Sequence, residues 1–137
     1  DLKKAYQVVM ASGCENAMII LDSWHWVRAD QPYDILTKEI AKKVVSIQIN
    51  DAYERPYAAP VLRDESMHDR LAPGTGCGDT AAFCRMLKEK GVEPKAMGVE
   101  VISDAILAKG VAAAAKFNFD NTVKVLQEGW PEAMPEK

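Results

Sequence analysis

Oxygen-bearing side chains stand toward the ends of three predicted strands. Asp22 closes the apolar run 17–21, and Gln48 and Glu100 lie toward the ends of two later apolar segments. Carboxylate and amide oxygens are hard ligands that suit Mg²⁺ or Mn²⁺. Because the loops that follow parallel strands gather at one end of a sheet, these side chains can converge on one metal ion. The residues alone also allow a structural reading, in which Asp22 caps a turn, Gln48 hydrogen-bonds within the core and Glu100 is a paired buried acid.

A histidine and an arginine stand where they can act on a substrate. His25 follows Asp22 by three residues, in the segment that leaves the first predicted strand. There an imidazole can serve as an acid, a base or a hydrogen-bond donor. Its neighbours Trp24 and Trp26 either wall a pocket or pack beneath a loop. Arg70 can clamp a carboxylate or a phosphate with its planar guanidinium, or it can be an ordinary surface arginine.

The most distinctive stretch is rich in glycine and runs from Asp69 to Asp79. Gly74-Thr-Gly-Cys-Gly78 comes just before a predicted helix, and the backbone N–H groups of such a turn can receive a phosphate. The stretch departs from the GxGxxG fingerprint, no predicted strand leads directly into it, and it has no P-loop lysine. We therefore expect a tight turn that caps the helix at Asp79-Thr80.

The elements that must position these residues alternate between helices and strands. The short apolar run 17–21 is typical of a strand that is covered on both faces, which favours a parallel sheet. Segment 51–70 has no clean periodicity, as in functional or disordered loops. Apolar periodicity, caps and stops predict helices over 2–10, 32–43, 79–91 and 119–130, and strands over 17–21, 44–50 and 96–102.

Composition narrows the class of protein. The 137 residues are 48% hydrophobic and 27% charged, which is enough apolar material for a packed core and argues against disorder. The net charge of −3 gives no basic field to attract nucleic acid or an anionic membrane. The longest apolar run is far too short to span a bilayer. Three cysteines without CxxC spacing favour neither a disulfide framework nor a zinc knuckle, and we expect a reducing, cytoplasmic setting.

Four motifs together resemble a known family. In order they are Leu21-Asp-Ser-Trp-His25, Ile47-Gln-Ile-Asn-Asp-Ala52, Asp69-Arg-Leu-Ala-Pro-Gly-Thr-Gly76 and Gly98-Val-Glu-Val-Ile-Ser103. They resemble the C-terminal part of the xylose isomerase-like sugar isomerase/epimerase barrels. The resemblance implies an α/β fold, namely the C-terminal portion of a (β/α)8 TIM barrel with about three βα units, strands 6–8. Residues 1–137 are then a single partial domain.

The resemblance also implies a site. It makes Asp22, Gln48 and Glu100 ligands of one divalent cation, Mg²⁺ or Mn²⁺. It gives His25 and Glu100 catalytic roles, and it places His25 and Arg70 in contact with the substrate. The glutamate that this family carries on its fifth strand, which is thought to work with the counterpart of Glu100 as an acid/base pair, has no counterpart in this sequence.

The implied function is that of a divalent-metal-dependent isomerase or epimerase of sugars or sugar phosphates, which abstracts a proton next to a carbonyl. Gln48 stands where the family usually has histidine, a departure that resembles the 3-dehydroshikimate dehydratase-like branch. A lyase of that kind, or one like inosose dehydratase, is therefore the alternative. The residues do not favour phosphodiester cleavage, the reaction of the endonuclease IV branch of the superfamily. That branch has more histidine ligands, whereas this chain has only His25 and His68 and lacks a basic groove.

The last alternative is a catalytically inactive barrel fragment. A partial barrel exposes two open sheet edges, which implies self-association or a missing N-terminal barrel half. The partner expected at the site is a small polar substrate, that is a sugar, a sugar phosphate or a cyclic hydroxyketone. Nucleic acid and membrane are not expected partners.

Overall fold

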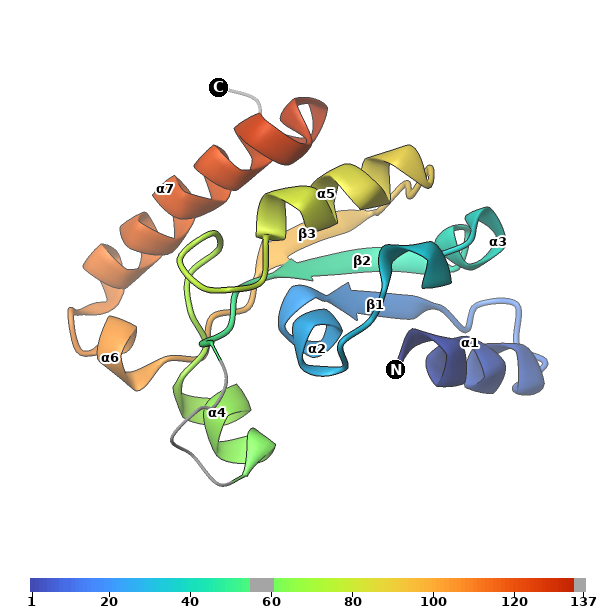
Figure 1. Ribbon diagram of the computed structural model, residues 1–137, viewed down its shortest axis with the longest axis horizontal. Helices are drawn as coiled ribbons and strands as arrows, with labels where there is room; N and C mark the ends of the chain where they lie inside the picture. Colours follow the sequence, from blue (N-terminus) through green and yellow to red (C-terminus); the bar gives the residue numbers. More distant parts are fainter. Residues whose placement is uncertain (55–60, 135–137) are drawn as a thin grey trace.

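The computed structural model describes residues 1–54 and 61–134 (Figure 1). It contains one sheet of three strands in the order β1-β2-β3, and both neighbouring pairs are parallel, as predicted. The elements in chain order are α1 (Leu2–Ala11), β1 (Ile19–Asp22), α2 (Ser23–Arg28), the 3-10 helix η1 (Tyr33–Ile35), α3 (Lys38–Ala41), β2 (Val44–Ile49), α4 (Leu62–His68), α5 (Thr80–Glu89), β3 (Ala96–Val99), α6 (Asp104–Leu107), α7 (Val111–Gly129) and the 3-10 helix η2 (Pro131–Ala133).

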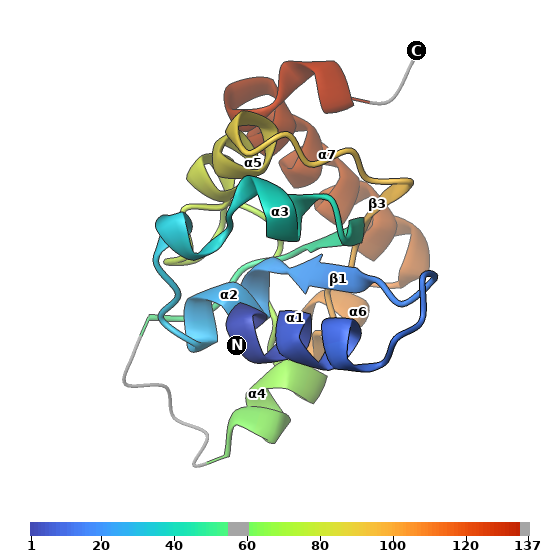
Figure 2. The same cartoon turned by 90° about the vertical axis from the view of Figure 1, so that its right-hand side faces the viewer.

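One face of the sheet is buried against helices. Leu21 on β1 and Ile47 on β2 are partners in the register, and both are almost completely buried. Phe83 and Leu87 of α5 belong to the same apolar cluster. Leu2 of α1 belongs to this cluster as well, and Figures 1 and 2 both show α1 beside β1 and α5 next to α7. Burial of apolar surface, at about 25 cal/mol per Å², is what holds these helices on the strands.

The opposite face carries the polar residues of the strands. Asp22, Gln48 and Gly98 form one row across β1, β2 and β3. Because side chains alternate along a strand, this row points away from the face that holds Leu21. Ile20, two residues before Asp22 on the same face, is 57% exposed. The row lies toward the carboxyl ends of the strands, where Figure 1 shows α2, α4 and α6 gathered.

The longer helices lie where periodicity predicted them. Asp79 caps α5, since its side chain accepts a hydrogen bond from Ala82 N at 3.0 Å. Helix α7 ends before Pro131, as predicted, but it begins at Val111 rather than at residue 119. Its first two turns are alanine-rich, which favours helix without producing an apolar stripe. None of the described helices has both the length and the hydropathy to cross a lipid bilayer.

The prediction of one helix over 32–43 was wrong. Residues Tyr33–Ile35 form a 3-10 turn, Leu36 is extended, and α3 begins only at Lys38. Leu36 is completely buried, so the break in the helix lets its side chain reach the core. Thr37 then caps α3 by accepting a hydrogen bond from Ile40 N at 3.2 Å.

Three short helices and one strand end also differ from the predictions. His25 lies in α2 rather than in a loop, and α4 and α6 lie in segments for which no helix was predicted. Strand β3 ends at Val99, so Glu100 follows the strand instead of belonging to it. Each of these helices has at most seven residues, which is too short for apolar periodicity to be recognised. Part of segment 51–70, residues 55–60, lies outside the described residues.

Candidate active site

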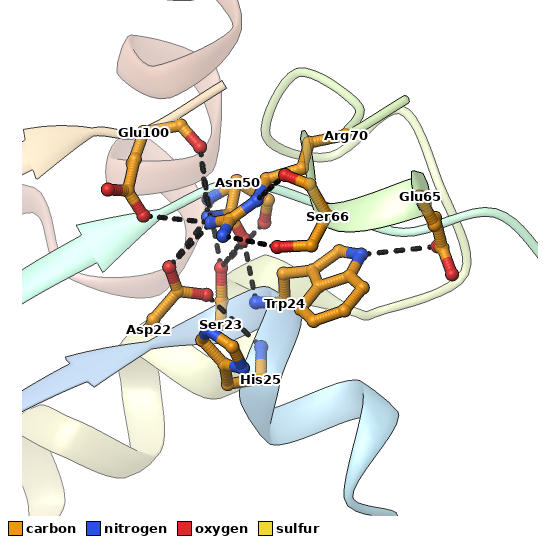
Figure 3. A network of polar contacts seen from close by, with 9 residues as sticks. All are labelled: Asp22, Ser23, Trp24, His25, Asn50, Glu65, Ser66, Arg70 and Glu100. Carbon is orange, nitrogen blue, oxygen red and sulfur yellow. Dashed lines mark hydrogen bonds and ion pairs between the residues drawn. The ribbon is translucent and has the colours of Figure 1, made fainter. Parts of the chain in front are cut away.

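Two of the predicted site carboxylates meet at one nitrogen atom (Figure 3). Arg70 Nη1 donates to Asp22 Oδ2 at 2.7 Å and to Glu100 Oε2 at 2.8 Å. The side chains of Arg70 and Asp22 are 4% and 5% exposed, whereas that of Glu100 is 36% exposed. Asp22 ends β1 and Glu100 follows β3, so the guanidinium joins the two outer strands of the sheet at their carboxyl ends.

The remaining guanidinium nitrogens of Arg70 are held from the side of α4. Nε donates to Ser66 O and Nη2 donates to Ser66 Oγ, each at 2.9 Å. The guanidinium carbon also lies 5.2 Å from the centre of the Trp24 ring, a distance at which a cation is attracted to the ring. Arg70 is therefore a buried, fully engaged side chain, not an ordinary surface arginine.

Asp22 divides its carboxylate between a cap and the site. Oδ1 accepts a hydrogen bond from His25 N at 3.1 Å and so caps α2. Oδ2 accepts from Arg70 and also from Asn50 Nδ2, the latter at 3.2 Å. Asp22 therefore has the capping role that the sequence allowed, and its second carboxylate oxygen binds Arg70.

Asn50 is a site residue that the sequence prediction did not include. It is completely buried just after β2. Its Oδ1 accepts from Trp24 N at 2.6 Å and from Ser23 Oγ at 2.9 Å. Its Nδ2 donates to Asp22 and to the backbone oxygen of Glu100, each at 3.2 Å. The amide thus connects the ends of all three strands. The signal for it was present, because Asn50 continues the polar, period-two face of its strand.

The proton affinity of Glu100 is altered by its neighbours. Burial, followed by its contact with the Asp22 carboxyl, raises the pKa of Glu100 above its ordinary value, and Arg70 opposes this shift. A carboxyl group whose pKa is raised toward neutral pH is better suited to exchanging a proton with a substrate.

The side chains of the other two predicted residues, His25 and Gln48, lie outside this hydrogen-bond network. The His25 ring is exposed, contacts the edge of Trp24 with ring centres 5.0 Å apart, and lies apart from Arg70 in Figure 3. Gln48 is the register partner of Asp22 on the neighbouring strand, and its side chain makes no hydrogen bond to the described residues. The register thus places Gln48 on the same face of the sheet as Asp22.

A cavity of about 540 Å³ lies next to the network. It is large enough for a small organic molecule. Its lining includes both apolar surface and polar site residues, among them Asp22, Trp24, His25, Arg28 and Ser66. The tryptophan therefore contributes a wall of this cavity, and it also packs beneath Arg70.

The oxygen atoms near Arg70 are of the type that binds a hard divalent cation. Asp22 and Glu100 bring carboxylate oxygens to within contact of one atom, and Gln48 lies on the strand between them. Among the residues that the structure describes, no group of three or more His, Cys, Asp or Glu side chains is arranged as a metal centre. A third ligand would therefore have to be of another type, such as an amide oxygen.

The glycine-rich turn binds the chain's own carboxylate. Asp51 is almost completely buried and accepts hydrogen bonds from Gly76 N at 2.9 Å and Gly78 N at 2.8 Å. A side chain at Gly76 would collide with Ala52 O and with Asp51. The expected capping turn before α5 is confirmed, and the N–H groups that a phosphate would need already bind Asp51.

A second buried network holds α4 in place. Glu65 accepts hydrogen bonds from Arg28 Nε at 2.9 Å and from Trp24 Nε1 at 3.1 Å. Arg28 also donates to Tyr53 O at 2.7 Å. Since α4 carries Ser66, this network fixes the helix that holds Arg70. No local pattern in the sequence could reveal it, because Arg28 and Glu65 are 37 residues apart.

Comparison with known proteins gives relatives of one enzyme type. An inosose isomerase of Halalkalibacterium halodurans is 29% identical over 125 residues, which cover 91% of this chain and 42% of that protein. An inosose isomerase of Bacillus licheniformis is 33% identical over 88 residues, or 64% of this chain and 30% of that protein. The chain thus spans less than half the length of these curated relatives.

Two solved structures share the fold. The crystal structure of the IOLI protein with a binding zinc atom matches with a TM-score of 0.78 and 26% identity, over 96% of this chain and 45% of that one. A xylose isomerase domain protein from Alicyclobacillus acidocaldarius matches with a TM-score of 0.70 and 25% identity, over 94% and 44%. The model of the xylose isomerase-like TIM barrel family matches residues 1–125. The resemblance expected from the four motifs is confirmed, and this chain belongs to the xylose isomerase-like TIM barrel family.

Proposed function

We propose that this chain forms the cation- and substrate-binding part of a divalent-metal-dependent isomerase that acts on a sugar or on an inosose-like cyclic hydroxyketone. The observation that carries the proposal is the convergence of Asp22 and Glu100 on one nitrogen atom at the carboxyl ends of parallel strands. Active sites of barrel enzymes are built at this end of the strands. The inosose isomerases among the relatives support the substrate class.

The proposal includes the place of the chain in a barrel. We assign β1, β2 and β3 to strands 6–8 of a (β/α)8 barrel and residues 1–137 to a single partial domain. The all-parallel order β1-β2-β3 supports this assignment. The match to less than half of the IOLI protein and of the Halalkalibacterium relative supports a partial barrel.

Asp22, Gln48 and Glu100 would hold the cation, with Mg²⁺ or Mn²⁺ as the ions that best suit three hard oxygens. The zinc atom in the IOLI protein supports a divalent metal in this fold. When bound, such an ion polarises a carbonyl oxygen of the substrate.

The protein's own residues would move the protons. Glu100, whose pKa is raised by burial, would take a proton from the carbon next to the carbonyl. His25 lines the cavity and would donate to, or position, a hydroxyl of the substrate. Arg70 would bind a substrate oxygen, once its Nη1 is released from the carboxylates. Proton abstraction followed by return to a neighbouring atom is an isomerisation.

Titration calorimetry with Mn²⁺ tests the cation site. The wild-type chain is expected to bind Mn²⁺, and Asp22→Ala and Glu100→Ala are each expected to weaken binding at least tenfold, because each removes a ligand. Asp104→Ala is the matched control, since Asp104 is an exposed carboxylate that pairs with His68. Unchanged affinity in both site variants would rule out the proposed ligands.

Proton chemistry is tested by NMR in D₂O on the protein supplied with the rest of its barrel. An isomerase is expected to place deuterium on the carbon next to the substrate carbonyl and to keep all hydroxyl groups. A dehydratase-like lyase is the second candidate, favoured by Gln48 at a position where this family usually has histidine. That enzyme would release water and form a conjugated enone, which absorbs in the ultraviolet.

A further inference from the structure

We propose that Arg70 is the exchange partner of the cation. Its guanidinium and a divalent cation compete for the Asp22 and Glu100 carboxylates, and the arginine that the cation displaces becomes a donor to the substrate. The inference rests on the proposed cation site and adds an order of binding to it, with the cation first and the substrate second.

The competition follows from the position of Nη1. This nitrogen lies 2.7 Å from Asp22 Oδ2 and 2.8 Å from Glu100 Oε2. A magnesium-sized ion sits about 2.1 Å from its oxygen ligands, so an ion bound to the same two oxygens would lie within about 5 Å of Nη1. Two positive centres that close repel each other strongly where water is scarce. The side chains of Asp22 and Arg70 are each at least 95% buried, whereas that of Glu100 is 36% exposed, so solvent screens this repulsion only weakly.

The local charge changes sign when a cation binds. Two carboxylates with one guanidinium have a net charge of about −1 at the ends of the strands, and a divalent ion beside the same guanidinium brings it to about +1. Arg70 thus neutralises the carboxylates in part, and the cation turns its guanidinium into a surplus positive charge, which favours an oxygen of the substrate as its new partner.

The displaced arginine keeps its place in the molecule. Nε and Nη2 donate to Ser66 O and Ser66 Oγ, and the guanidinium lies over Trp24. None of these contacts depends on the two carboxylates. Asp22, Trp24 and Ser66, which all contact Arg70, line the 540 Å³ cavity. Arg70 is thus separated from the cavity only by side chains that line it, and we expect a released Nη1 to donate to an oxygen of a substrate bound there.

Calorimetric titration of the 137-residue chain with Mn²⁺ alone tests the exchange. The variant is Arg70→Met, which keeps most of the side-chain length and removes the charge. The control is Arg85→Met, which removes the same charge from a half-exposed arginine whose nearest acid, Glu128, is 4.0 Å away. Arg70→Met is expected to bind Mn²⁺ at least tenfold more tightly than the wild type, and Arg85→Met is expected to match the wild type.

The outcomes separate this inference from the proposed function. Binding by Arg70→Met that is equal to or weaker than wild-type binding overturns the exchange and leaves the cation site standing. Absence of binding in both proteins overturns the cation site and the exchange together. Binding by Arg70→Met alone supports the exchange. If circular dichroism shows that Arg70→Met is unfolded, Arg70→Gln decides, because glutamine also removes the charge and keeps a polar head that can bind Ser66. Tighter binding than wild type supports the exchange, and equal or weaker binding overturns it.

Discussion

At the scale of single residues, each buried acid in the described chain has a partner of its own. Asp22 is paired with Arg70, Glu65 with Arg28, and Asp51 with the N–H groups of the glycine-rich turn. Removing one partner of such a pair leaves an uncompensated charge in the interior, which costs about 3–5 kcal/mol for a buried ion pair. Substitutions of these partners are therefore expected to affect folding as well as chemistry, and binding measurements need stability controls.

Asn50 provides the most direct test of how the strand ends are joined. We expect Asn50→Ala to lower the free energy of unfolding by roughly 2–4 kcal/mol, because the buried donors and acceptors it satisfies lose their partner. Urea unfolding followed by circular dichroism measures this. Asn121→Ala is the matched control, since its amide makes a bond to Phe117 O within α7. Equal loss in the two variants would contradict a special role for Asn50.

Mn²⁺ titration of the same variant separates positioning from simple stability. Partners that orient a metal ligand typically change metal affinity 10- to 100-fold. If Asn50 orients the Asp22 carboxylate, the folded fraction of Asn50→Ala will bind Mn²⁺ at least tenfold more weakly than wild type.

The three cysteines are expected to differ in reactivity. Cys14 and Cys77 are exposed, whereas Cys84 is completely buried and burial raises its pKa to about 12. At pH 8 only about one Cys84 thiol in ten thousand is then a thiolate, the reactive form. Intact mass spectrometry after iodoacetamide treatment should find two adducts on the native chain and three after denaturation. Rapid addition of a third adduct to the native chain would mean that α5 opens readily.

At the scale of elements, the turn before α5 is fixed by contact with Asp51. Gly76→Ala is expected to destabilise the fold by about 2–3 kcal/mol, because the new methyl group would collide with Ala52 O and Asp51. Gly98→Ala is the matched control. Gly98 lies in β3 with open space where its side chain would be, so alanine there should be neutral or slightly stabilising. Thermal unfolding of both variants measures the difference, and similar melting temperatures would contradict it.

The parts of the fold that the sequence predicted are those with a local signal. A continuous apolar run gave β1, alternation gave β2, and a capping aspartate with a stripe gave α5. Helix α4 had no such signal, because its anchor is Glu65, a charged residue buried against Arg28. An acid in the interior becomes intelligible only when its distant partner is known.

The acids of the candidate site could be predicted from the sequence, but the contacts that join them could not. Parity and strand ends singled out Asp22 and Glu100, which the structure brings to one atom. The sequence pointed to Arg70 as a substrate contact but not as their bridge, since those contacts span 48 and 30 residues. Asn50 lies on the polar, period-two face of its strand, as a site residue should. Nothing in the local sequence, however, distinguishes a polar side chain that binds neighbouring strands from one that faces water.

At the scale of the whole molecule, the sheet has two unpaired sides. In the described chain β1 and β3 each pair only with β2, and Ile20 is exposed on the face opposite the buried cluster. Exposed strand edges and apolar faces promote association between chains. We therefore still expect this chain to self-associate or to pair with the rest of a barrel. An oligomer without activity would favour the alternative that the chain is a catalytically inactive barrel fragment.

Sedimentation velocity over a range of concentrations tests this expectation. The wild type is expected to self-associate, and Ile20→Lys is expected to weaken association at least tenfold by placing a charge on the open face. Val8→Lys is the control, because Val8 is a 70% exposed apolar residue on helix α1 and not on a strand. A wild type that is monomeric at every concentration would contradict the prediction.

The bridge between Asp22, Arg70 and Glu100 also has a consequence for biosynthesis. A ribosome releases the chain from its N-terminus, so Asp22 emerges well before Arg70, and Glu100 emerges last. The pair of Asp22 and Arg70 can form during translation, but the bridge closes only after β3 has joined the sheet. A nascent chain stalled before β3 would hold Arg70 with the Asp22 carboxylate alone, so the complete site depends on the last strand of the sheet.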